Sequence, residues 1–185
     1  MKTRAVRLYG ANDLRLEEFE LPEITEEEIL VKVVSNSICM SAYKATILGK
    51  NHKRVPNDCD VNPIITGHEF AGKIIKVGKM WQDQFKAGEK FGIQPALNYK
   101  GSMDSPGYSF PWYGGNMTYA VIPKEVMEIN CLINYSGDAY FEASLAEPMS
   151  CVIGGFHASY HIKPSTYNHI MDIKDNGALA ILGGC

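Results

Sequence analysis

The chain has 185 residues, a formal net charge of −3 and a hydrophobic fraction of 45%, as expected for a globular protein with one sizeable core. So mild a charge argues against a nucleic-acid or membrane partner, and no apolar run approaches the length of a membrane span. The first ten residues contain no apolar signal core, and the five cysteines form no CxxC pair. We therefore expect a cytoplasmic protein with reduced thiols.

The first 130 residues predict short strands separated by glycine-containing turns. The candidate strands lie at residues 4–8, 14–21, 26–39, 71–78, 89–95 and 114–123. Short strands at such close spacing are typical of a closed or nearly closed β architecture.

The pattern changes after residue 137. Residues 137–147 and 148–160 are helix-like, and Pro148 suits the first turn of a helix. Residues 161–177 predict a loop with a short element. The final "ALAILGGC" reads as an apolar strand that runs into Gly183 and Gly184, which is how a dinucleotide-binding βαβ unit begins. Gly-Gly alone is most often a simple turn, but we expect the chain to be a fragment cut within such a unit.

Side chains of the types that bind zinc occur in three separate segments: Cys39, the adjacent His68 and Glu69, and Glu147. Catalytic zinc takes thiolate, imidazole and carboxylate ligands and keeps one position open. Gly67 permits an unusual backbone, so that both neighbouring side chains could face one centre despite the alternation of a strand. The alternatives are an ordinary core histidine, a small buried thiol, and for Glu147 a carboxylate at a helix N-terminus.

A family resemblance rests on six segments that occur in order. They are "SICMSAYK", "GHEFAGKIIKVG", "KAGEKFGIQP", "GGNMTYAVIP", "AEPMSCVIGGFH" and "ALAILGGC". Together they make the chain closely resemble the zinc-dependent branch of the medium-chain dehydrogenase/reductase superfamily over essentially its whole length. Within that branch it looks most like the polyol and sugar-phosphate dehydrogenases, and "MSAYK" and "GKNHKRVP" resemble the L-sorbose 1-phosphate reductase group.

The resemblance implies a mostly β fold with some α. Residues 1–150 would form a GroES-like, partly open β-barrel catalytic domain. Residues 151–185 would supply a linking helix and the first strand of a truncated Rossmann domain, with Gly183 and Gly184 beginning the coenzyme site.

The resemblance also implies a ligand set and a reaction. Cys39, His68 and one of Glu69 and Glu147 would hold a single catalytic zinc, with the choice between the glutamates left open. Hydride would then pass between NAD or NADP and a polyol or ketose phosphate. Many relatives carry a second, structural zinc on four cysteines, but the corresponding residues 96–115 contain no cysteine. This segment instead carries four aromatic residues that would pack the lobe or line the cleft: Tyr108, Phe110, Trp112 and Tyr113.

Three further positions bear on the chemistry. Ser41 matches the hydroxyl of the family's proton relay, whereas Ala42 replaces the acid that commonly follows it. Lys44 would replace the relay histidine or contact a substrate phosphate, unless it is a solvated surface amine. The basic run His52, Lys53 and Arg54 would bind a substrate phosphate near the cleft mouth, or else form a solvated turn.

The leading hypothesis is thus a zinc-dependent oxidoreductase with a small-molecule substrate, no nucleic-acid or membrane partner, and a homo-oligomeric state when full length. One alternative is a non-catalytic zinc-binding fragment, because these 185 residues alone would lack the coenzyme domain and activity. Another is a threonine or simple alcohol dehydrogenase of the same fold.

Overall fold

A computed structural model gives the conformation of residues 1–178 and of residue 180. The chain forms two compact units, Met1–Glu147 and the residues from Pro148 onward. Most of the predicted terminal strand, including Gly183 and Gly184, lies outside the described residues. The predicted domain boundary at residue 150 stays a prediction.

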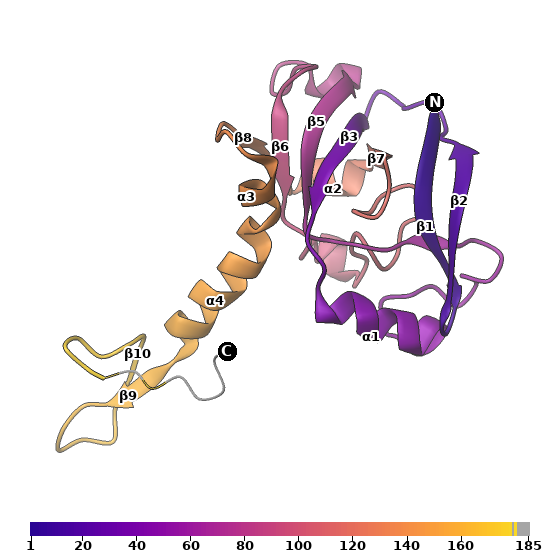
Figure 1. Ribbon diagram of the computed structural model, residues 1–185. Coiled ribbons are helices and arrows are strands. Elements are labelled where there is room, and N and C mark those ends of the chain that lie inside the picture. Colours follow the sequence, from indigo (N-terminus) through magenta and orange to yellow (C-terminus); the bar gives the residue numbers. More distant parts are fainter. Residues whose placement is uncertain (179, 181–185) are drawn as a thin grey trace. The chain divides into compact units, whose positions relative to one another are not determined.

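The first unit is built from antiparallel strands in two sheets (Figure 1). One sheet has the strand order β2-β1-β4, and the other has the order β7-β3-β5-β6-β8. The strands are β1 (Lys2–Gly10), β2 (Asp13–Glu20), β3 (Ile29–Asn36), β4 (Ile64–Ile65), β5 (Phe70–Val77), β6 (Lys90–Ile93), β7 (Tyr119–Ile122) and β8 (Leu132–Tyr135).

The two sheets meet along β1 and the segment before β7. Ala5 forms a β-bridge with Met117, and the Val6 amide donates to the Asn116 carbonyl at 2.9 Å. The sheets therefore curve around a shared core, which confirms the predicted GroES-like, partly open barrel. Phe70 is fully buried there, with the rings of Phe91 and Tyr113 edge-on at 6.2 and 5.5 Å.

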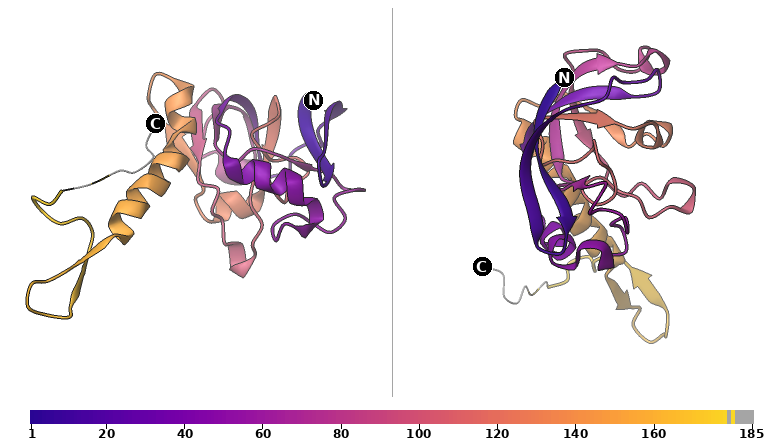
Figure 2. Two further views of the ribbon diagram at one scale, coloured as in Figure 1. Left: turned by 60° about the horizontal axis from the view of Figure 1, so that its bottom comes forward. Right: turned by 90° about the vertical axis from the view of Figure 1, so that its right-hand side faces the viewer.

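Four helices lie between or after the strands along the chain. They are α1 (Met40–Leu48), α2 (Lys124–Glu128), α3 (Tyr140–Ser144) and α4 (Ala146–Ala158), with short 3-10 turns at Gly49–Asn51, Lys79–Trp81 and Tyr99–Gly101. The views in Figure 2 show α1 at one end of the β1–β2 hairpin, consistent with its contacts to β1.

The helix α1 has no counterpart among the predicted elements. Its sequence "MSAYKATIL" buries only Ala45 and therefore lacks the apolar periodicity that predicts a helix. It ends at Gly49, which adopts a positive φ of 51°. The helix matters for function because it carries Ser41 and Lys44.

The second unit contains most of α4 and the strands β9 (Tyr160–Ile162) and β10 (His169–Met171), which pair as an antiparallel hairpin. The hairpin occupies part of the region where a loop and one short element were predicted. None of the helices in the described part of the chain has the length and apolar character needed to cross a bilayer.

Candidate metal centre and substrate pocket

The backbone turns sharply at Gly67, immediately before the adjacent histidine and glutamate. Gly67 has a φ of +88°, and its carbonyl accepts the Gly115 amide at 2.7 Å. The regular strand β5 starts only at Phe70, so His68 and Glu69 are not bound by strand alternation. Their side chains can therefore serve one centre.

Three potential ligand atoms converge at this turn. The thiol of Cys39, a ring nitrogen of His68 and a carboxylate oxygen of Glu69 all lie within 4.8 Å of one another. Within the described ranges they form the only such group of three or more ligand-type residues. His68 and Glu69 are each 5% exposed, and Cys39 is the N-cap residue of α1. Sulfur, imidazole nitrogen and carboxylate oxygen together are the donor set that zinc prefers.

The surroundings keep His68 neutral and Glu69 ionised. Burial lowers the pKa of His68, although the Glu69 charge acts in the opposite direction. Burial by itself would raise the pKa of Glu69. Hydrogen bonds with Ser37, Cys39 and Glu147, together with the His68 charge, outweigh burial and hold that pKa below its usual value. A neutral imidazole and an ionised carboxylate are the forms that bind a metal.

Two further observations fit a cation at this position. Glu147 hydrogen-bonds with Glu69, and two carboxyl groups in contact need a proton or a cation between them. The His68 Nε2 atom lies 4.0 Å from the Glu69 Oε1 atom, so the imidazole presents this nitrogen to the same point as the carboxylate. The residues present therefore fit a zinc ion.

The cluster adjoins a pocket of about 320 Å³. Its wall includes Ser41, Lys44, His52, Arg54, His68 and Glu147. Ser41 Oγ lies 2.8 Å from Cys39 Sγ and 3.2 Å from His68 Nε2. The structure thus brings most of the predicted site residues together. Lys53 is the exception among those that it describes, because it is exposed and lines only the adjoining hollow, which His52 and Arg54 also border.

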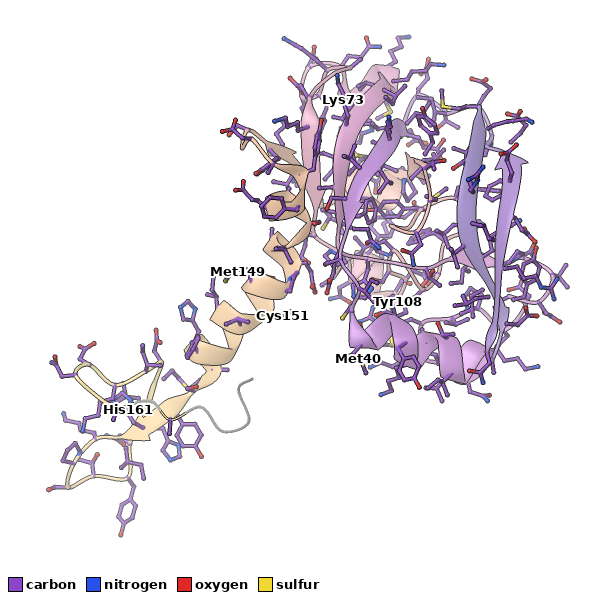
Figure 3. The ribbon with its side chains drawn as sticks, in the orientation of Figure 1. Met40, Lys73, Tyr108, Met149, Cys151 and His161 are labelled. Carbon is purple, nitrogen blue, oxygen red and sulfur yellow. The ribbon has the colours of Figure 1, made fainter. Side chains whose placement is uncertain are left out.

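The aromatic segment divides between two roles. Phe110, Trp112 and Tyr113 pack in or against the main core, which is the first of the two roles expected from the sequence. Tyr108 instead lines the pocket, with its ring stacked on His52 at 5.2 Å and tilted against His68 at 5.0 Å. Burial raises the pKa of Tyr108, while its hydrogen bond with Ser41 acts in the opposite direction. In Figure 3 its side chain lies near the start of α1, which is marked by Met40.

Sequence reasoning missed Ser37 altogether. Its hydroxyl donates a very short hydrogen bond to the Glu69 carboxylate, and its amide donates to the Glu69 carbonyl at 2.9 Å. The only signal was a hydroxyl residue two positions before Cys39, which is too common to single out. Ser37 orients Glu69 toward the cluster.

The antiparallel, partly open barrel and its buried cluster define the GroES-like catalytic-domain class of medium-chain dehydrogenases. Residues 25–131 match the model of the alcohol dehydrogenase GroES-like domain. The chain belongs to this family.

Sequence and structure comparisons agree on this class. The chain is 52% identical over 182 residues to L-sorbose 1-phosphate reductase of Klebsiella pneumoniae, which covers 98% of the chain and 44% of that protein. It is 51% identical to mannitol-1-phosphate 5-dehydrogenase of Aliivibrio fischeri, over 98% of the chain and 43% of that protein. The chain thus spans less than half the length of these relatives. The structure of 2R,3R-butanediol dehydrogenase from Bacillus subtilis matches with a TM-score of 0.62 at 24% identity, over 79% of the chain and 44% of that protein.

Proposed function

We propose that the protein is a zinc- and nicotinamide-dependent oxidoreductase that interconverts a polyol, or its phosphate, and the corresponding ketose. The convergence of Cys39, His68 and Glu69 beside a pocket carries this proposal. The names of the relatives, a sugar-phosphate reductase and a polyol-phosphate dehydrogenase, support the substrate class.

In this proposal, Cys39 and His68 hold the zinc together with Glu69 or Glu147. Zinc supplies a Lewis acid that polarises a carbonyl or acidifies an alcohol, and NAD or NADP supplies the carrier of the hydride. The buried imidazole and carboxylate exclude water from the donor atoms. The absence of cysteine from residues 96–115 leads us to propose one zinc per chain.

We assign to Ser41 the role of accepting the proton of the substrate hydroxyl. Its Oγ lies 2.8 Å from the Cys39 thiol and 3.2 Å from the His68 imidazole, and Tyr108 lines the same pocket. The hydroxyl can accept a proton from an alcohol and pass one on in the same step. Lys44 follows one helical turn later on the pocket wall, where it would either stand at the outer end of this relay or contact a substrate phosphate.

Substitutions of the two glutamates are expected to differ in their effect on zinc binding. If Glu69 is the ligand, Glu69→Gln abolishes zinc binding and Glu147→Gln weakens it only modestly, whereas the reverse pattern assigns Glu147. With either glutamate as the third ligand, a bound zinc would keep a position for the substrate oxygen. We also propose a coenzyme site beginning at Gly183 and Gly184, a homo-oligomer and a cytoplasmic location.

Metal removal tests this proposal. Treatment of the purified full-length protein with a chelator should abolish coenzyme reduction by mannitol 1-phosphate, and added zinc should restore it. Magnesium serves as the matched control, because a thiolate–imidazole site binds it poorly. Undiminished turnover by protein shown to be free of metal would contradict the proposal.

A further inference from the structure

Arg54 differs from the other three arginines of the chain. Arg4, Arg7 and Arg15 each lie within 3.9 Å of a carboxylate, on Glu18, Glu17 and Asp13 respectively. Arg54 forms no ion pair with any of the described residues, and it is the arginine that lines the pocket beside the metal centre. A half-buried guanidinium without a counter-ion is suited to an anionic ligand.

The arginine is held in place by its own loop. The guanidinium Nη1 donates to the Met103 carbonyl at 2.6 Å, and the Arg54 carbonyl accepts the Ser109 hydroxyl at 2.7 Å. One of its five donor hydrogens is thus used for positioning, and the rest of the fork remains for a ligand. Such preorganisation reduces the entropy that binding costs.

A second cation and a neutral donor share this wall of the pocket. Lys44 forms no ion pair within the described part of the chain and lines the same pocket. His52 is partly buried, and burial and the charges of Lys44, Arg54 and Lys53 lower its pKa. Its Nδ1 accepts the Arg54 amide at 3.3 Å, so the neutral ring carries its hydrogen on Nε2, as a donor.

We propose that Arg54, Lys44 and His52 form a phosphate subsite that selects phosphomonoester substrates over free polyols. Lys44 and Arg54 form no ion pair among the described residues, and Glu147 is the one carboxylate on their pocket wall, so an anionic ligand would reduce the repulsion between the two cations. A phosphate satisfies both charges and accepts hydrogen bonds from all three side chains. This inference rests on the proposed function for the reaction itself, but the subsite is defined by its own residues.

Lys53 supplies the matched control. It carries the same charge and adjoins Arg54 in sequence, yet it is exposed and lines the neighbouring hollow instead of this pocket. A general effect of positive charge on an anionic ligand would involve Lys53 and Arg54 alike. If phosphate binds in the pocket, its affinity should depend on Arg54 and not on Lys53.

A phosphate could also come from the coenzyme, and the test separates these sources. Binding of mannitol 1-phosphate, mannitol, inorganic phosphate, NAD and NADP is measured by calorimetry on the protein and on Arg54→Gln, Lys44→Gln and Lys53→Gln. Thermal unfolding of each variant verifies that it is folded.

Arg54→Gln should weaken the binding of mannitol 1-phosphate and of inorganic phosphate by about 10- to 100-fold. Lys44→Gln should weaken both by about 3- to 10-fold, and Lys53→Gln by less than about 2-fold. Binding of mannitol and of the two coenzymes should stay unchanged in all variants.

Equal losses for mannitol and mannitol 1-phosphate, or a loss confined to NAD and NADP, would overturn the subsite. So would equal effects of Arg54→Gln and Lys53→Gln. Because these titrations need no turnover, they also separate the two proposals. If turnover depends on zinc but phosphate binding does not depend on Arg54, only the subsite is rejected. If phosphate binding depends on Arg54 but turnover does not depend on zinc, only the proposed reaction is rejected.

Discussion

At the residue scale, the centre depends on the conformation of one glycine. Gly67 has a positive φ, a conformation that a residue with a Cβ adopts only at a cost. The sequence suggested this role, because a glycine next to an adjacent His-Glu pair is where alternation can break. It could not distinguish Arg54 from Lys53, since loop side chains have no periodicity that predicts which one faces a pocket.

Gly67→Ala should destabilise the protein by about 2 kcal/mol or more and displace His68. A Cβ there would lie 2.9 Å from the Asn116 amide nitrogen, in addition to the cost of the positive φ. Urea unfolding and zinc affinity measure the two effects. The matched control is Gly10→Ala, whose Cβ would meet nothing within 4 Å. Equal stability of the two variants would contradict the assigned strain.

Tyr113→Phe should leave stability unchanged or raise it by about 1 kcal/mol. The Tyr113 hydroxyl is buried and has no hydrogen-bond partner in the part of the chain that the structure describes, so its removal takes away an unpaired polar group and keeps the ring. Thermal unfolding of the protein and of Tyr113→Phe measures the difference in stability. A loss of about 1 kcal/mol or more would show that the hydroxyl has a partner after all.

At the element scale, the strands were predictable and the helix that carries the pocket was not. Strands β3, β5 and β7 follow from their β-branched runs and the glycine turns between them. The helix α1 has no apolar stripe, because little more than Ala45 faces the protein interior. Its formation depends on the tertiary contacts of the loop between β3 and β4, which no local pattern encodes.

The contact between β3 and β5 depends on Gly72. A Cβ at this position would lie 1.9 Å from the Lys32 carbonyl oxygen, so Gly72→Ala should force the strands apart and cost about 2–4 kcal/mol. The matched control is Gly92→Ala in β6, where the nearest atom would be 3.6 Å away. Denaturant unfolding of both variants checks this prediction, which requires a clear difference between them.

At the scale of the whole molecule, the first unit gathers the centre from segments far apart in the chain. Cys39 follows β3, His68 and Glu69 precede β5, and Glu147 lies in the first turn of α4. The resemblance to known dehydrogenases identified these positions as metal ligands. The spacing of the residues alone could not distinguish them from ordinary core or capping residues. The antiparallel pairing of β3 with β5, which sets Asn36 opposite Phe70, explains how Cys39 meets His68 and Glu69, because these residues lie just beyond the paired ends of the two strands.

The zinc content of the purified protein, measured together with that of Cys39→Ser and Cys151→Ser, tests the metal centre most directly. Cys151 is exposed and lies in α4, in the unit that does not contain the centre, which makes it the matched thiol control. We expect about one zinc per chain in the protein and in Cys151→Ser, and almost none in Cys39→Ser. Full zinc occupancy in Cys39→Ser, or no zinc in the protein after reconstitution, would contradict the account.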